Sequence, residues 1–435
     1  MKIQIIIFLL ASIIYAAPQN FKLKEVIRLA LENSKEIEEI DIKIDKAKIN
    51  ILNASGIWKP TIDLKVYTAP IWKTSGSIDS YDNDYSKWGV FAHGEVTLFQ
   101  PLFMWNMQKN YYKAAEGGLN VAKIEVKEEK NKILKRLIGY YLNAKLSGKL
   151  MDLASSNSPL FEKAETYLAK SGKSKDLIKF KIKRQSIEEK VEEASLTKEV
   201  TEKAVSFYID VPVSSDEFIE ANLSLLSFRS DELKHYQDMA RQNNFSVHKL
   251  EEGLLAKNEL LKAEKKKKYP VFFAAVNGSY SFSNVKENQE NPWVHDPYNN
   301  ETAGAVVGMK LDLNFNNIST NEKKALVEHK ELLIKKSYAD KVLMLTVEKA
   351  FREFMYHKKL VSSTKESMQL AKKLFIKESL TYELKKNNGK DLLEALFERV
   401  LAIKNHYTAV SNCNSKYIEL LDLCGYDLSD LTLYE

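Results

Sequence analysis

One polar phrase occurs twice in the chain, and its residue types can form hydrogen bonds. Residues 167–181 read YLAKSGKSKDLIKFK and residues 382–396 read YELKKNNGKDLLEAL. Each copy begins with Tyr, has Lys three residues later and Asp nine residues later, and places a Gly-containing interruption between two helix-forming stretches. A Tyr hydroxyl donates and an ionised carboxylate accepts. The chemistry of the phrase is therefore that of a polar contact.

The second copy carries a further carboxylate, because Glu394 follows Asp391 by three residues. This spacing places both side chains on one face of a helix, one turn apart. Several copies around a narrow opening would concentrate negative potential, favour cations and raise some of their own pKa values. The alternative is an exposed Asp at a helix N-terminus, where the helix dipole favours a negative charge. The residues alone leave both interpretations open.

Patterns for catalysis and metal binding are missing from the sequence. The seven histidines show no metal-ligand spacing, and there is no glycine-rich phosphate loop and no nucleophile motif. We therefore expect a protein that is not an enzyme and has neither a cofactor nor a metal site. Its 65 basic and 59 acidic residues nearly cancel, which argues against a nucleic-acid partner.

The basic run KAEKKKK, residues 262–268, is the exception to this even charge distribution. It closes a helical stretch, where cations interact favourably with the C-terminal dipole. A solvated helix end explains the run, and contact with anionic lipid is the alternative.

The N-terminal segment, residues 1–16, has one Lys followed by an apolar run and small residues, which is typical of a secretory signal peptide. No later stretch of about 20 apolar residues predicts a transmembrane helix. The two cysteines, Cys413 and Cys424, lie in or beside one helix, roughly 16 Å apart along its axis. We expect them to be buried and unbridged, because a disulfide cannot span that distance.

The segments that must position the phrase occur in the same order in both halves of the sequence. Residues 23–33, LKEVIRLALEN, align with residues 233–243, LKHYQDMARQN, and a proline follows 30 residues after the shared Ala in each copy. The opening phrase recurs at nearly the same offset. We therefore predict two repeats, at residues 17–220 and 221–435.

After each of these prolines the hydrophobic period changes from helical to alternating. The sequence predicts two strands per repeat, with polar loops between them: about 58–72, 88–102, 269–284 and 302–315. Alternation over about ten residues suits a membrane β-barrel with a wet lumen. Four strands cannot close a barrel, so several chains would have to share it. A soluble four-stranded sheet under helices is the alternative.

The rest of the chain is predicted to be helical. Residues 320–384 contain neither Gly nor Pro, and apolar residues recur there every seven positions, which indicates a coiled-coil seam. Residues 104–170 form the counterpart, with a helix restart expected at Ser158-Pro159. Each long helix turns back at a tip, near 171–175 and near 385–390, and the phrase lies at these tips.

This pattern resembles the TolC-like outer-membrane efflux protein family. The resemblance rests on LKEVIRLALENS, on Pro60 and Pro270, on QPLF before the first long helix, on Y-x8-D-L-L at the second tip and on LLDLCG near the end. It implies a mostly α fold with a membrane β part. Long coiled-coil hairpins are joined to four strands per chain, which contribute to a trimeric twelve-stranded barrel.

The resemblance also implies roles for residues at the tips. An acidic residue at the position of Asp176 hydrogen-bonds a Tyr at the position of Tyr382, as a latch that holds the tunnel closed. Carboxylates at the positions of Asp391 and Glu394 surround the pore entrance. The chain departs from the family where Asn387 replaces a basic gate residue of some members. Contacts with an adaptor protein are implied for the tip residues, two of which are lysines in place of the family's glycine: Lys170, Gly172, Lys385 and Gly389.

The implied function is that of an outer-membrane exit duct in a tripartite efflux or type I secretion system. Its expected partners are two further copies of the chain, a periplasmic adaptor, an inner-membrane pump and outer-membrane lipid. The expected location is the outer membrane of a Gram-negative bacterium, with a periplasmic helical extension. A periplasmic coiled-coil adaptor is the alternative, since such a protein also has a helical hairpin and a signal sequence.

Overall fold

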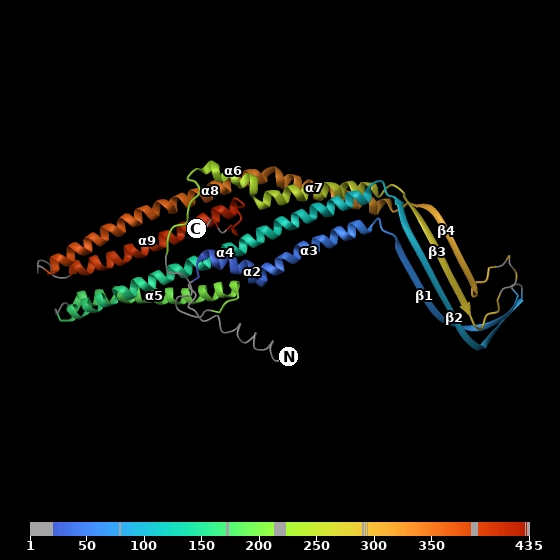
Figure 1. The fold of residues 1–435 in the computed structure, drawn as a ribbon, viewed down its shortest axis with the longest axis horizontal. Coiled ribbons are helices and arrows are strands. Elements are labelled where there is room, and N and C mark those ends of the chain that lie inside the picture. Colours follow the sequence, from blue (N-terminus) through green and yellow to red (C-terminus); the bar gives the residue numbers. More distant parts are fainter. Residues whose placement is uncertain are drawn as a thin grey trace, which may run out of the picture. The chain divides into compact units, whose positions relative to one another are not determined.

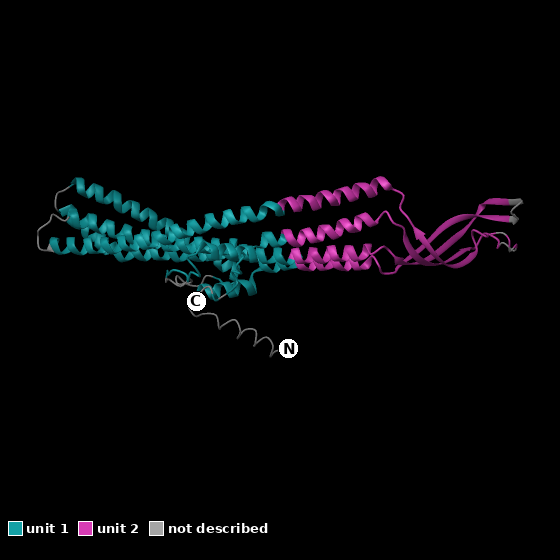
Figure 2. Cartoon of the chain, turned by 90° about the horizontal axis from the view of Figure 1, so that it is seen from above, with its two compact units in different colours: residues 1–43, 123–249, 336–435 teal, residues 44–122, 250–335 magenta. Residues whose placement is uncertain are grey.

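A computed structural model describes most of the chain, namely residues 21–77, 80–170, 174–212, 223–288, 291, 293, 295–383, 390–430 and 432. It is mostly helical and has one antiparallel sheet of four strands. Figure 2 colours its two compact units. Unit 1 comprises residues 1–43, 123–249 and 336–435, and unit 2 comprises residues 44–122 and 250–335. The predicted signal peptide lies outside the described residues.

The elements follow one another in the same order in each half of the chain (Figure 1). In the first half they are α2 (Leu23–Asn33), α3 (Lys35–Gly56), β1 (Thr61–Ser77), β2 (Ser80–Phe103), α4 (Met107–Lys170) and α5 (Ser174–Ile209). In the second half they are α6 (Leu233–Asn243), α7 (Phe245–Lys266), β3 (Val271–Ser283), β4 (Asn300–Lys310), α8 (Phe315–Glu383) and α9 (Lys390–Leu423). Helices α2 and α6 have 11 residues each, and α3 and α7 have 22 each.

The first hairpin of the sheet is longer than its apolar residues predict. Residues 73–87 were expected to form a polar loop, but β1 and β2 continue through most of them. A register shift lies between Trp72 and Lys73, and beyond it the strands stay paired. There Asn83 accepts hydrogen bonds from Trp72 Nε1 (3.2 Å) and from Thr74 Oγ1 (2.7 Å). Polar side chains thus support the pairing where the alternation has ended.

Strand β4 is shorter than the predicted strand 302–315, because α8 begins at Phe315. Asn314 Oδ1 accepts a hydrogen bond from the backbone N–H of Asn317 (3.1 Å), which is the geometry of a helix N-cap. Asp312 accepts one from Asn314 in the same way (2.9 Å). These residues alternate with apolar ones like strand residues, but they act as turn and cap residues.

The predicted helix restart at Ser158-Pro159 is wrong, because α4 runs through Pro159 without a break. A proline inside a helix removes one backbone hydrogen bond. In the turn before it, Asn157 Nδ2 donates to the carbonyl of Leu153 (2.6 Å) and Ser155 Oγ donates to that of Asp152 (3.1 Å). Side chains therefore supply additional hydrogen bonds where the helix is weakest.

Unit 1 has a core of large side chains at less than 2% exposure, contributed by α2, α4, α5, α6, α8 and α9: Ile27, Ile133, Leu134, Leu137, Ile138, Tyr141, Ile209, Tyr236, Phe354, Tyr417 and Ile418. The buried tyrosines find hydrogen-bond partners, as Tyr141 does at the carbonyl of Phe21 (3.1 Å). Val347, Phe354 and Val361, which belong to the predicted seven-residue seam, are buried. Cys413 and Cys424 are buried and free, as expected.

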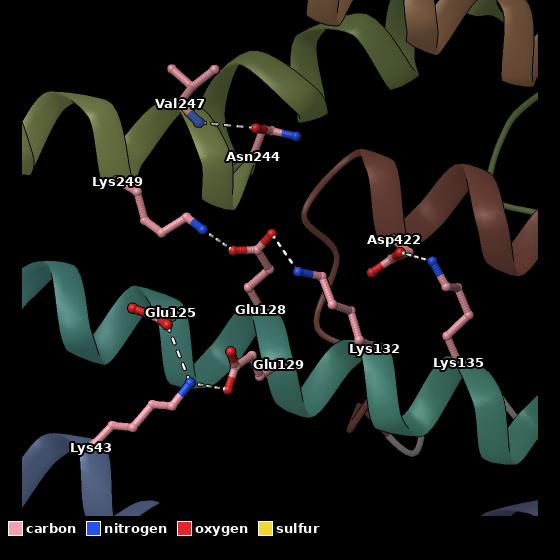
Figure 3. Close-up of polar contacts among 10 residues, drawn as sticks. All are labelled: Lys43, Glu125, Glu128, Glu129, Lys132, Lys135, Asn244, Val247, Lys249 and Asp422. Carbon is pink, nitrogen blue, oxygen red and sulfur yellow. Dashed lines mark hydrogen bonds and ion pairs between the residues drawn. The ribbon is translucent and has the colours of Figure 1, made fainter. Parts of the chain in front are cut away.

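Charged side chains join several helices of unit 1 (Figure 3). Glu128 of α4 contacts Lys249 of α7 and Lys132 of its own helix (2.9 Å to Lys132), and Lys43 of α3 contacts Glu125 and Glu129. Burial raises the pKa of Glu128, but the hydrogen bonds from the two lysines outweigh it, so that the pKa lies below its usual value. Glu128 is therefore held in its charged form.

The end of α9 requires glycine. Gly425 has φ +72°, and a Cβ there would lie 2.0 Å from the carbonyl oxygen of Asn243. Its neighbour Tyr426 donates its backbone N–H to Leu421 (3.0 Å), which closes the helix. The LLDLCG motif of the sequence thus forms the helix terminus.

Candidate functional site

The sheet in unit 2 has two chemically different faces. Its strands pair in the order β1-β2-β3-β4, with every neighbour antiparallel. Leu64 pairs with Val96, Val96 with Gly278, and Gly278 with Ala303, so that one row across all four strands is apolar. Leu64 is 68% exposed and Val96 46%. Within one chain, this apolar face is open to its surroundings.

The opposite face carries a polar hydrogen-bond network in its middle rows, and phenylalanines such as Phe99 and Phe273 pack together nearer the helices (centroids 4.9 Å apart). In the two rows that flank the Val96 row, Asn277 Nδ2 donates to Glu95 (2.9 Å) and to Thr97 (2.8 Å). Lys65 lies 3.8 Å from the same glutamate. Further along, His93 Nδ1 contacts Ser281 Oγ at 2.8 Å. The alternation predicted from the sequence therefore separates an apolar surface from one that carries polar contacts.

The two outer strands leave the sheet open. No described strand pairs with the outer edge of β1 or with that of β4. Because the four strands alternate in direction, β1 and β4 run opposite ways. An edge of unpaired backbone groups cannot lie in hydrocarbon without a partner. A second strand must therefore cover each edge if the apolar face contacts lipid.

In unit 1 the two helical hairpins contact each other near their tips, by an aromatic cluster from α4, α5 and α9. Phe397 lies 5.3 Å from Phe161 and 5.6 Å from Phe180, between ring centroids. Phe161 and Phe180 are buried, and Leu168, Leu396 and Val400 complete the core there. Lys183 Nζ lies 5.1 Å from the centre of the Phe397 ring. This phenylalanine cluster (Phe161, Phe180 and Phe397) joins the first hairpin to the second.

The two tyrosines that begin the repeated phrase meet. The rings of Tyr167 in α4 and Tyr382 in α8 pack edge to face, with centroids 5.6 Å apart. Desolvation, and then the charge and hydrogen bond of Tyr167, raise the pKa of Tyr382. Asp176 is the predicted hydrogen-bond partner of Tyr382, and no contact between these two is found among the described residues. That pairing stays a proposal for the assembled protein.

The predicted entrance carboxylates lie in the first turn of α9. Asp391 and Glu394 are both exposed, and Lys390 lies 4.0 Å from Glu394. Asp176 occupies the equivalent first turn of α5 and is half-buried. Lys170 is exposed at the end of α4. The remaining predicted tip residues lie outside the described residues: Gly172, Lys385, Asn387 and Gly389.

A groove in unit 1 lies beside the phenylalanine cluster. It has a volume of about 590 Å³ and lies between α4, α5 and α9. Its lining is mainly apolar, with Leu150, Ile187 and Leu401, and it includes charged side chains such as Lys190 and Glu398. The groove is open.

Sequence reasoning missed the phenylalanine cluster and the role of Tyr167 as the neighbour of Tyr382. A signal was present, because Phe180 and Phe397 both follow the Asp of the phrase, by four and six residues. Among the described residues, His, Cys, Asp and Glu are nowhere grouped to hold a metal ion. Within the same part of the chain, no helix combines the length and the apolarity needed to cross a membrane.

The chain resembles several solved structures. No protein-family model matches it, and no curated protein does. The open-state MtrE outer-membrane channel of Neisseria gonorrhoeae superimposes with a TM-score of 0.73 at 14% identity, over 94% of this chain and 89% of that one. The CmeC outer-membrane channel of Campylobacter jejuni gives 0.70 at 15% identity, over 94% and 87%.

The outer-membrane protein VceC of Vibrio cholerae gives a TM-score of 0.72 at 13% identity, over 93% of this chain and 96% of that one. Each match covers helices and strands together, nearly from end to end. The predicted resemblance is thereby confirmed at the level of the fold. The chain has the fold of the TolC-like outer-membrane efflux channels.

Proposed function

We propose that the chain is one protomer of a homotrimeric outer-membrane exit duct that serves an efflux or type I secretion system. The two-faced sheet with open edges carries this proposal. Its apolar rows fit lipid and its polar rows fit a water-filled lumen. Because β1 and β4 run in opposite directions, β4 of one chain can pair antiparallel with β1 of the next.

Three chains would supply twelve strands and close the barrel, as the fold comparison supports. The helical hairpins then form the periplasmic extension, and their tips are the contact for a periplasmic adaptor and an inner-membrane pump. The tip contacts are assigned to Lys170, Gly172, Lys385 and Gly389. The proposed location is the outer membrane of a Gram-negative bacterium. The two structural repeats, residues 17–220 and 221–435, are supported by the equal lengths of α2 and α6 and of α3 and α7.

We assign two functions to the tips. Asp391 and Glu394, in three copies, form a negative entrance that favours cations. Tyr382 and Asp176 form the closing latch of the assembly, and Asn387 supplies no second charge to it. Tyr167 packs against Tyr382 and keeps its ring in place.

A periplasmic adaptor is the alternative function, and the observations favour it less. An adaptor has one coiled-coil hairpin, whereas this chain has two, α4 with α5 and α8 with α9. The paired strands with an exposed apolar face have no use in a protein that stays in water.

The test is to express the full chain in a Gram-negative host, fractionate the membranes and reconstitute the purified protein in planar bilayers. The duct should fractionate with the outer membrane and give discrete conductance steps. An adaptor would follow the inner membrane and give none, and that result would overturn the proposal.

A further inference from the structure

The basic run at residues 262–268 has no role in the proposed duct. It joins the end of α7 to the start of β3, and it therefore lies at the end of the sheet that meets the helices. Three of its lysines are held by neighbouring side chains: Lys262 by Glu259 (2.6 Å), Lys266 by Asn110 (2.7 Å) and Lys267 by Glu264 (2.9 Å). These three lysines have structural roles.

The other two lysines of the run, Lys265 and Lys268, are exposed. Two more exposed lysines lie at the same end of the sheet. Lys310 ends β4 and is the register partner of Val271, and Lys59 comes just before β1. We call Lys59, Lys265, Lys268 and Lys310 the lysine rim.

The charges of the lysine rim are not paired in the part of the chain that the structure describes. Within the described ranges, none of its four lysines forms an ion pair with a carboxylate, while the neighbouring Glu259 and Glu264 already pair with Lys262 and Lys267. A favourable helix dipole explains lysines at the end of α7. The same explanation covers Lys59, which follows the end of α3 and donates its backbone N–H to Gly56 (2.9 Å). It does not explain Lys310, which ends strand β4.

Half-exposed aromatic side chains lie among these lysines. Trp105 packs on Tyr269 with centroids 5.3 Å apart, and its Nε1 donates to the carbonyl of Pro270 (2.8 Å). Trp58 lies beside Lys59 and is 39% exposed. Trp and Tyr rings next to Lys, at the end of an apolar strand face, are characteristic of the headgroup level of a bilayer.

We propose that the lysine rim binds the headgroup phosphates of anionic phospholipid in the membrane leaflet that faces the helices. This proposal rests on the proposed outer-membrane duct, which places this end of the sheet at that leaflet. The aromatic rings lie at the boundary between acyl chains and headgroups, and the lysine amines reach the phosphates from there. The rim thus fixes the depth of the sheet in the bilayer.

The test compares three forms of the full chain, purified in non-ionic detergent. They are the wild type, a rim variant with Lys59→Gln, Lys265→Gln, Lys268→Gln and Lys310→Gln, and a control variant. The control removes the same charge from four exposed lysines of α8 in unit 1: Lys359→Gln, Lys372→Gln, Lys373→Gln and Lys377→Gln. Binding of phosphatidylglycerol and of phosphatidylethanolamine is titrated by native mass spectrometry.

The wild type and the control should prefer phosphatidylglycerol. The rim variant should bind it roughly tenfold more weakly or worse, since each lysine near an anionic surface contributes severalfold in affinity. Inorganic phosphate at the same concentration should not displace the lipid. Equal binding of phosphatidylglycerol by the rim variant, or full displacement by phosphate, would overturn the proposal.

Conductance in planar bilayers, recorded on the same preparations, separates this proposal from the duct. If the wild type conducts but shows no preference for phosphatidylglycerol, the proposed lipid binding by the lysine rim is wrong and the proposed duct function is still supported. Protein that neither inserts nor conducts would overturn both.

Discussion

The sheet and the helical tips differ in whether their contacts are completed within one chain. In the sheet, the outer edges of β1 and β4 lack a described partner strand, and apolar side chains such as Leu64 are exposed. At the tips, Phe161 and Phe180 of the first hairpin are buried against residues of the second hairpin in the same chain. Under the proposed function the sheet needs other chains to pair its edges, whereas the contact between the hairpins forms within one chain.

This difference implies that assembly of the barrel and closure of the tunnel at the tips depend on different regions of the chain. A barrel that needs several chains should form all together or not at all, because a partly closed sheet leaves unpaired edges in lipid. Hairpins that pack within one chain can change their contacts without dissociation of the proposed trimer. We therefore expect substitutions in the sheet to affect insertion, and substitutions at the tips to affect the closed state.

The largest expected effect is at the phenylalanine cluster. Phe161 is 5% exposed, and Phe161→Ala should cost about 3–5 kcal/mol of local stability, because it leaves a cavity between the hairpins. Hydrogen exchange should accelerate in α4, α5 and α9 near the tips and stay unchanged in the strands. The control Phe207→Ala changes a side chain of α5 that is 73% exposed, and it should have little effect. Faster exchange in the strands of the Phe161 variant would show that the two regions are not independent.

The second-largest expected effect is that of a charged side chain placed on the apolar face of the sheet. Val96→Arg should cost about 2–4 kcal/mol of bilayer stability if its row lies in the hydrocarbon. Ser279→Arg is the matched change, since its register partner is Glu95 in the adjacent polar row. The measurement is the fraction of protein that folds into lipid vesicles. Equal loss in both variants would contradict the assignment of the faces.

The tip hydroxyls should have a smaller effect. A hydrogen bond to a carboxylate is worth about 1.5–3 kcal/mol when shielded and less when wet. Tyr382→Phe should therefore raise single-channel conductance and sensitise cells to large antibiotics, and Asp176→Asn should act in the same direction.

Tyr167→Phe is the control for the latch, because it keeps the ring packing against Tyr382 and removes only the hydroxyl. It should raise conductance less than Tyr382→Phe does. If Tyr167→Phe opens the channel as much and Asp176→Asn has no effect, the latch is the tyrosine pair itself.

The smallest expected effect on structure is at the entrance carboxylates. Replacing Asp391 and Glu394 by Ala should weaken cation preference and relieve block by multivalent cations, without loss of assembly. Glu189 and Glu192, exposed in α5 with the same spacing, provide a matched double substitution. Unchanged selectivity in the first variant, measured as the reversal potential in a salt gradient, would exclude both residues from the pore mouth.

Much of the fold follows from periodicity in the sequence. The change from helical to alternating periodicity after Pro60 and Pro270 predicts where β1 and β3 begin, because the period of the apolar residues reports which face is buried. The end of β4 could not be predicted in this way. Asp312 and Asn314 alternate with leucines like strand residues, and only their capping hydrogen bonds show that they belong to the start of α8.

The candidate site was less accessible to sequence reasoning. The repeated phrase predicts where the tips lie. It does not predict which residue of one tip contacts which residue of the other. The contact of Tyr167 with Tyr382 depends on how two hairpins pack, and that packing is set by the phenylalanine cluster, whose residues are distant in sequence. Contacts between elements of this kind require the tertiary structure.

The most direct test of the central claim is the mass of the detergent-solubilised protein, measured together with its β content by circular dichroism. If open strand edges force the chains to share one barrel, the folded sheet should occur only in particles with the mass of three chains. Particles with the mass of a single chain that retain full β content would contradict the account.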